Sequence, residues 1–263
     1  MIIKQFISHQ IKESMRSSFW QKQIALNIIM GIFLLIMLAY LVMLGLFIDV
    51  IFREAFPDQD PILLINKIIL YYFGIELMIR FFMQSLPILN LETYLALPVP
   101  KSSIVHYVAS KSIINIGNYL SWLVFIPFAF KVIAPAYTTG VACLWALAMI
   151  LLVFSCNFLA TYIKRQLAHK AWIVGLFALA MVGLFALDHF KIFSLSNISN
   201  ALMGGILTKP LWILVPIITL IGTYALNYFF LKRRLYPDEI NPKRKERTDR
   251  LGEIKYLKSI GFN

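Results

Sequence analysis

Six apolar segments, each close to the length of a membrane-crossing helix, constrain this chain more than any other feature. An α-helix rises 1.5 Å per residue, so about 20 apolar residues span the roughly 30 Å of hydrocarbon in a bilayer. The segments are residues 24–52, 62–88, 104–133, 139–163, 171–187 and 210–231. The pattern predicts an all-α fold, a polytopic membrane helical bundle with six transmembrane helices.

The composition excludes an ordinary soluble domain. Hydrophobic residues make up 60% of the 263 residues and charged residues only 14%, whereas soluble domains carry about 25% charged residues. Such a chain has too little polar surface to cover its apolar side chains in water. A lipid bilayer is therefore the expected solvent.

The positions of the Lys and Arg residues predict the orientation. With the N-terminus inside, nineteen of these 25 residues fall on the inner side, and two, Lys67 and Arg80, fall within the second span. The outer side receives only Arg53, Lys131, Lys191 and Lys209. Because Lys and Arg are enriched in cytoplasmic loops, we expect a multi-pass protein of the cell (inner) membrane with both termini in the cytoplasm.

Two polar segments flank the six-helix domain expected at 23–231. Residues 1–22 place apolar side chains at helical spacing opposite a basic face, which is typical of an interfacial helix. This helix is either a simple anchor or a docking surface. The tail 232–263 has ten basic and five acidic residues, so it binds anionic membrane lipid or contacts another protein. Nucleic acid is not an expected partner, because no aromatic platform accompanies the charge.

A proline corner separates the second and third spans. Residues 88–97 form a short amphipathic segment, and Leu97-Pro98-Val99-Pro100-Lys101 follows. The prolines remove two backbone donors and favour extended geometry before them, while Ser102 or Ser103 is expected to cap the next helix. The corner is either a rigid turn or a lever through which a cytoplasmic partner moves the bundle.

This layout resembles the membrane (permease) subunits of type-2 ABC exporters, many of which carry a Leu-Pro-(Val/Ile)-(small or Pro)-(Lys/Arg) element between spans two and three. The resemblance covers residues 1–234, and this part of the chain is similar to the N-terminal half of a longer bacterial permease family. The chain is therefore either a half-size subunit or part of a longer one. The resemblance implies a separate P-loop ATPase as partner, and a homodimer or a second permease half. It assigns coupling to the ATPase to Glu92, Tyr94, Leu95, Pro98 and Lys101.

Charged and amide side chains inside the spans are the other candidates for function. Glu76 and Arg80 stand at i, i+4 in the second span, so each can neutralise the other. They form either a structural pair or a polar patch that lines a substrate path or a dimer interface. Asn115 and Asn118 are expected on one face of the third span, where they join helices or contact a ligand.

The sequence also lacks several motifs. It has no G-x-x-x-x-G-K-[ST], so ATP binding is expected on a separate chain. No metal or cofactor site is expected, since His9, His106, His169 and His189 are scattered. We expect an export permease subunit rather than an enzyme. The alternatives are an assembly or structural subunit and a lipid-acting membrane enzyme, which would need a polar cluster at one membrane level.

Two smaller expectations concern irregular positions in the chain. Pro127 and Pro216 are expected to kink the third and sixth spans. Residues 188–209 are polar and are expected to form a short lid, a re-entrant turn or a loop.

Overall fold

The structure is a computed structural model that describes residues 24–83, 100–167 and 172–234. Every regular element in these ranges is a helix. Five helices are long and apolar enough to cross a membrane, and they are Ile28–Ala55, Pro61–Met83, Gly117–Ala136, Thr139–Gln166 and Pro210–Arg233. The all-α bundle with the composition of a multi-pass membrane protein is therefore confirmed.

Four of the six predicted spans correspond to single long helices. They are α3 (Ile24–Ala55), α4 (Pro61–Met83), α9 (Thr139–Leu167) and α12 (Leu214–Arg234). The fifth predicted span corresponds to α10 (Trp172–His189). Its apolar part, Gly175–His189, is shorter than the spanning helices. The described residues therefore contain five candidate spans, and the sixth predicted span is not confirmed.

The third predicted span is not one helix. It divides into α6 (Lys101–Ile113) and α7 (Gly117–Phe128), with a break at residues 114–116. The side-chain oxygen of Asn115 accepts a hydrogen bond from the Gly117 backbone N–H at 2.9 Å. A short amide side chain that bonds the backbone in this way competes with the helical ladder, which explains why the apolar run is interrupted here.

The two prolines act differently from one another. Pro127 lies inside α7, and the chain after it widens into a π-helical turn, η1 (Ala129–Ile133), before the short α8 (Ala134–Ala136). Pro216 lies in the first turn of α12, just after the 3-10 turn η2 (Pro210–Ile213). The first turn of a helix tolerates proline because its N–H has no helical partner. Pro216 therefore lies at the start of a helix rather than at a kink within the sixth predicted span.

Helix α6 also begins differently from the sequence-based expectation. Its N-cap residue is Pro100, and no side-chain cap bond is present. The Ser103 backbone N–H instead donates to the Pro100 carbonyl at 2.9 Å. The proline corner therefore leads directly into the helix without a serine cap.

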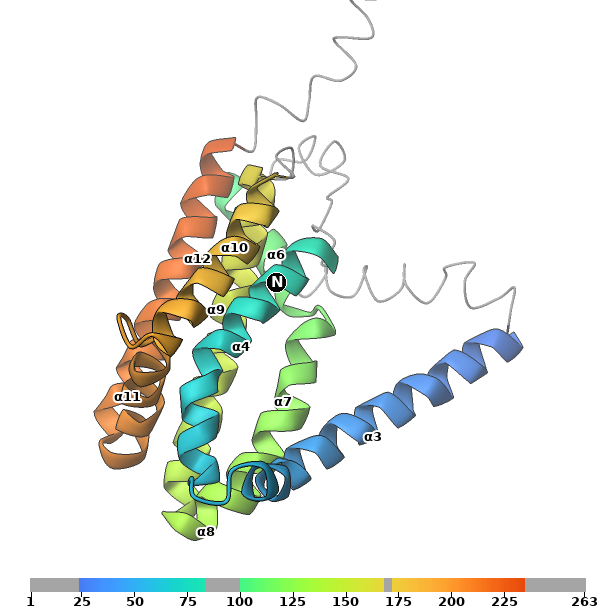
Figure 1. The fold of residues 1–263 in the computed structure, drawn as a ribbon. Coiled ribbons are helices and arrows are strands. Elements are labelled where there is room, and N and C mark those ends of the chain that lie inside the picture. Colours follow the sequence, from blue (N-terminus) through green and yellow to red (C-terminus); the bar gives the residue numbers. More distant parts are fainter. Residues whose placement is uncertain (1–23, 84–99, 168–171, 235–263) are drawn as a thin grey trace, which may run out of the picture.

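Helix α9 forms the centre of the bundle (Figure 1). Trp145 and Met149 of α9 are fully buried, together with Phe128 and Ile133 from the α7–η1 segment. The Trp145 indole packs against the Phe128 ring with centroids 5.8 Å apart. Helices α4 and α12 lie alongside α9, so the largest apolar side chains of the described residues meet around one central helix.

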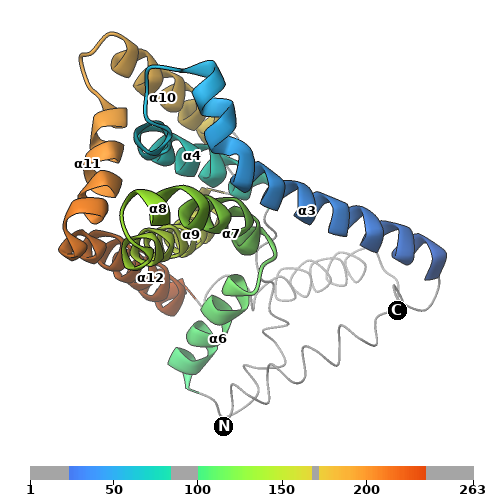
Figure 2. The same cartoon turned by 90° about the horizontal axis from the view of Figure 1, so that it is seen from below.

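Helix α3 lies at the edge of the bundle and diverges from it toward its N-terminal end (Figures 1 and 2). It crosses α7 at Gly45, where an added Cβ would overlap the Val124 carbonyl. Near its C-terminal end, Asp49 forms an ion pair with Lys131 of η1 at 2.8 Å. Its N-terminal half exposes large apolar side chains such as Phe33 and Leu35, at 69% and 68%.

Residues 188–209 are not a loop over most of their length, because they contain α11 (Leu195–Thr208). The Ser194 hydroxyl caps this helix by accepting from the Asn197 backbone N–H at 3.2 Å. The buried Ser199 hydroxyl donates to the Asn66 carbonyl at 2.5 Å and accepts from the Leu70 N–H at 3.2 Å. Its polar residues thus bind α4, which is why a polar sequence folds here as a packed helix.

Helix ends that carry basic residues meet at one end of the molecule. Ile104 and Val105 of α6 pack against Leu231 near the end of α12. The Lys164 ammonium, near the end of α9, donates to the Phe82 carbonyl at the end of α4 at 3.4 Å. The acidic connection between α3 and α4 lies at the opposite end of α4.

Candidate functional site

An ion pair buried inside the bundle forms the core of the candidate site. Arg80 Nε donates to Glu76 Oε1 at 2.8 Å, and Nη2 of the same guanidinium also contacts that oxygen. The side chains of Glu76 and Arg80 are only 10% and 7% exposed. Removing two charges from water costs several kcal/mol per ion unless further hydrogen bonds compensate. The surrounding partners therefore decide whether this pair is tolerated.

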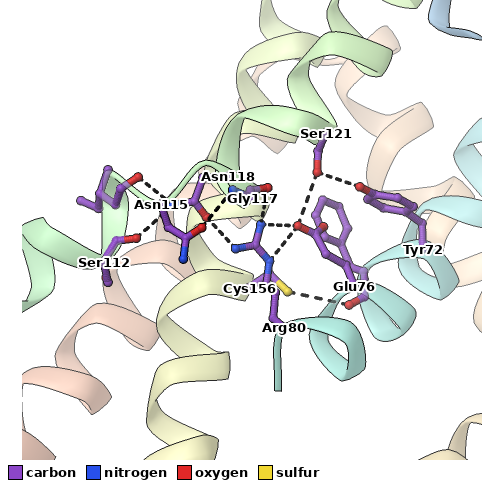
Figure 3. A network of polar contacts seen from close by, with 11 residues as sticks. Tyr72, Glu76, Arg80, Ser112, Asn115, Gly117, Asn118, Ser121 and Cys156 are labelled. Atoms are coloured by element: carbon purple, nitrogen blue, oxygen red, sulfur yellow. Dashed lines mark hydrogen bonds and ion pairs between the residues drawn. The ribbon is translucent and has the colours of Figure 1, made fainter. Parts of the chain in front are cut away.

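The remaining donors of Arg80 reach the first turn of α7 (Figure 3). Nη1 donates to the Asn118 side-chain oxygen at 2.6 Å, and Nη2 donates to the Gly117 carbonyl at 3.2 Å. The planar guanidinium can form several such bonds at fixed angles. Arg80 thus joins α4 to the segment that follows the α6–α7 break.

Asn118 closes the break from the other side. Its amide nitrogen donates to the carbonyls of Ser112 and Ile113, at 3.1 Å and 2.7 Å. These carbonyls lie at the end of α6, where the helical hydrogen bonds stop, and the Ser112 carbonyl also accepts a long bond from the Asn115 backbone N–H at 3.4 Å. The fully buried Asn118 side chain therefore accepts a hydrogen bond from Arg80 and donates hydrogen bonds to the last carbonyls of α6.

The network continues into α9 through Ser112. The Ser112 hydroxyl donates to the Ala109 carbonyl at 2.8 Å and accepts from the Asn157 side-chain amide at 3.0 Å. Asn157 is fully buried. Helices α4, α6, α7 and α9 are consequently joined by one set of polar side chains within an apolar bundle.

Two hydroxyls extend the network toward α3. The Ser121 hydroxyl donates to Glu76 Oε1 at 3.4 Å and lies 2.7 Å from the Tyr72 hydroxyl. Figure 3 shows Tyr72 and Ser121 on one side of Glu76, with Arg80 and Asn118 on the other. The second carboxylate oxygen, Glu76 Oε2, is buried and has no hydrogen-bond partner.

The predicted site residues divide into two groups. Glu76 and Arg80 are brought together in the predicted pair. Glu92, Tyr94, Leu95 and Pro98 lie outside the described residues, and Lys101 is the first residue of α6. Among the described residues, no group of three His, Cys, Asp or Glu side chains could hold a metal ion.

Sequence reasoning missed Tyr72 and Ser112 as members of the network, and it misplaced Asn118. Tyr72 precedes Glu76 by four residues, so the same i, i+4 spacing that pairs Glu76 with Arg80 could have identified it. Asn118 was expected to share a helical face with Asn115. The break separates the two residues, and each amide instead binds backbone groups around residues 112–117.

A second polar cluster lies at the C-terminal end of α10. Asp188 accepts hydrogen bonds from the Tyr71 hydroxyl at 2.6 Å, the Ser194 hydroxyl at 2.8 Å and the Ser196 backbone N–H at 2.9 Å. The bond from Tyr71, followed by those from the two serines, lowers the pKa of Asp188 to about 2. This carboxylate fixes the turn from α10 into α11 against α4.

A family model matches the chain over residues 10–262. The chain belongs to DUF5687, a family of unknown function. Comparison with curated proteins and with solved structures finds no match. The matched residues include both the ion pair of α4 and the proline corner.

Proposed function

We propose that this DUF5687 chain is the permease subunit of an ABC-type exporter and forms the transmembrane pathway driven by a separate P-loop ATPase. It lies in the cell membrane with both termini in the cytoplasm. Two copies, or this chain and a second permease half, complete the pathway. The ATPase contacts the proline corner at Pro98 and Lys101 and the segment before it.

The observation that carries the proposal is the break between α6 and α7, which is held by hydrogen bonds from other helices. Helix α6 begins directly after the proline corner and ends at residues 114–116. Arg80 and Asn118 hold that end against α4. Interrupted helices inside a membrane occur where other protein groups satisfy the freed backbone, and transporters use them at moving sites.

Helix α6 is short, and it lies between the proline corner and a break that is held by hydrogen bonds. It can therefore act as a lever. Force applied at Lys101 moves α6 as a rigid body, and the motion reaches α12 through the contact of Val105 with Leu231. It also reaches α4 through Asn118 and Arg80. An ATPase that closes on the corner can therefore change the packing of several helices at once.

The arrangement of charge supports the orientation. Lys164 and Lys232 lie near the ends of α9 and α12, at the same end of the bundle as the start of α6. The acidic α3–α4 connection lies at the other end of α4. Lys and Arg are enriched on the cytoplasmic side of membrane proteins, so the end that carries the proline corner faces the cytoplasm.

Affinity purification from mild detergent tests the proposal. The tagged chain is expected to retain a P-loop ATPase, and a Lys101→Glu variant is expected to retain about tenfold less because a corner contact changes sign. Lys209→Glu, a charge reversal at the exposed residue that ends α11, is the matched control and should retain the parental amount. Failure of the parent to retain any P-loop ATPase would refute the proposal.

A lipid-acting membrane enzyme is the second candidate, and one observation favours it. Glu76, Tyr72 and Ser121 form the polar cluster at one level of the bundle that such chemistry requires. Turnover of a lipid headgroup by the purified chain, lost in Glu76→Gln, would support this candidate. Recovery of a larger complex without an ATPase or lipid turnover would instead support an assembly or structural subunit.

A further inference from the structure

A cavity of about 340 Å³ lies between α3, α4 and α7. Ten of its twelve lining residues are aliphatic or phenylalanine side chains, and the other two are Tyr72 and Ser121. Ligand pockets of roughly 300–1,000 Å³ hold small molecules. The cavity is therefore large enough for part of a ligand and apolar except where these two hydroxyls meet.

The packing of α3 explains why the cavity exists. Gly45 lets α3 approach the Val124 carbonyl of α7 closely, and this contact fixes the crossing point of the two helices. Leu44 and Ile48 on either side of Gly45 are only partly buried, and they line the cavity. The cavity lies beside this crossing, and α3 diverges from the bundle beyond it, toward its N-terminal end (Figure 2).

The two hydroxyls at the cavity wall can offer a ligand only acceptor capacity. Ser121 has one hydrogen and directs it to the Glu76 carboxylate, so Tyr72 must donate the bond that joins the two hydroxyls. Each oxygen still has an unused lone pair. A ligand that forms a hydrogen bond here must therefore be the donor.

The charge behind the wall sets a second requirement. Glu76 lies within hydrogen-bonding distance of Ser121, and its Oε2 atom has no partner. Because Arg80 already binds this carboxylate and both hydroxyl hydrogens are engaged, a carboxylate or phosphate at the wall would find no donor. An apolar cavity between membrane helices also takes up hydrocarbon in preference to water.

We propose that this cavity binds the hydrocarbon chain of a neutral amphiphile, whose hydroxyl or amide N–H donates to Tyr72 or Ser121. The ligand class is a long-chain alcohol or amide, and long-chain anions are excluded. Binding does not depend on transport, so the inference stands apart from the proposed function. Where that function holds, the ligand contacts a hydrogen-bonded path from Ser121 through Glu76 and Arg80 to the α6–α7 break.

Photolabelling of the purified full chain in phosphatidylcholine nanodiscs tests the inference. The probes are hexadecan-1-ol with a mid-chain diazirine and the matching hexadecane without the hydroxyl. The alcohol is expected to label peptides from α3 and α7 about fivefold more than the alkane, the ratio of one net hydrogen bond. Unlabelled hexadecan-1-ol should compete, and hexadecanoate at pH 8 should not.

Matched variants separate the cavity from the general lipid surface. Leu44→Trp fills the cavity and should reduce alcohol labelling about tenfold, whereas Ile36→Trp, on the exposed surface of the same helix, should leave it unchanged. Ser121→Ala and Tyr72→Phe should remove the preference for alcohol over alkane. Leu41→Phe replaces Leu44→Trp if the latter does not fold.

Two outcomes would overturn the inference. One is equal labelling of the parent by the alcohol and the alkane. The other is unchanged alcohol labelling in folded cavity-filling variants. Because no ATPase is present in this assay, neither outcome bears on whether the chain associates with one.

Discussion

Arg80 Nη1 donates a hydrogen bond to the Asn118 side-chain oxygen at 2.6 Å, although the two residues are 38 positions apart. The same Asn118 amide donates to the last carbonyls of α6. The Arg80 guanidinium of α4 is therefore hydrogen-bonded to the break between α6 and α7.

The first prediction concerns the charge pair. Glu76→Ala leaves Arg80 buried without its counter-ion and should lower the free energy of unfolding by about 3–5 kcal/mol. Glu76→Ala/Arg80→Ala removes both charges and should recover part of this loss. Thermal unfolding in detergent compares the variants. Equal stability of the single and double variants would show that the ion pair does not act as a unit.

The second prediction concerns the hydrogen bonds of Asn118 at the break between α6 and α7. Asn118→Ala removes one acceptor and two donors from a buried site and should cost about 2 kcal/mol, because buried partners lose their hydrogen bonds. Asn115→Ala is the matched control, since Asn115 makes one such bond from a half-buried position and should cost less. Similar unfolding temperatures for the two variants would contradict the assigned role of Asn118.

The third concerns the close crossing of α3 and α7. Gly45→Ala places a methyl group against the Val124 carbonyl, and overpacking of this kind costs about 1–3 kcal/mol. Gly31→Ala, in the same helix, meets no atom within 4 Å and should be neutral or slightly stabilising. Thermal unfolding again compares the variants, and equal effects of the two substitutions would contradict the observed crossing.

The fourth concerns pH. The pKa of Asp188 is lowered to about 2 in the folded protein, so Asp188 binds protons more weakly there than in the unfolded chain. Its contribution to stability is present above its ordinary pKa near 4 and is lost as the pH falls toward 2. Tyr71→Phe removes the main cause of the shift and should flatten the decrease.

Unfolding midpoints between pH 5 and pH 2 measure this effect. Asp188→Asn is the control, because it cannot titrate and should lose less stability than the parent over this interval. A parent and an Asp188→Asn variant with the same decrease would show that other groups cause the acid sensitivity.

The sequence was sufficient where a local pattern determines the structure. Long apolar runs predicted α3, α4, α9 and α12, and the i, i+4 spacing brought Glu76 and Arg80 together. It was insufficient where distant residues decide. The run 104–133 has the apolarity of one helix, and the break becomes stable only because Arg80 and Asn118 satisfy the freed groups.

Helix α11 illustrates the same limit. Its polar residues predicted a short lid, a re-entrant turn or a loop, yet Ser199 is buried in a helix because α4 presents the Asn66 carbonyl to it. The cavity beside Tyr72 was equally inaccessible to sequence reasoning, since side chains from α3, α4 and α7 line it together. Partners more than one hundred residues apart leave no periodic signal in a single sequence.

Cysteine labelling at the proline corner tests the central claim most directly. In a Cys143→Ser/Cys156→Ser background, a membrane-impermeant maleimide is applied to intact cells carrying Lys101→Cys or Gln59→Cys. The account predicts that Gln59→Cys, in the exposed α3–α4 connection, is labelled from outside and Lys101→Cys only in inverted vesicles. Labelling of Lys101→Cys in intact cells would place the corner beyond the reach of a cytoplasmic ATPase and would contradict the account.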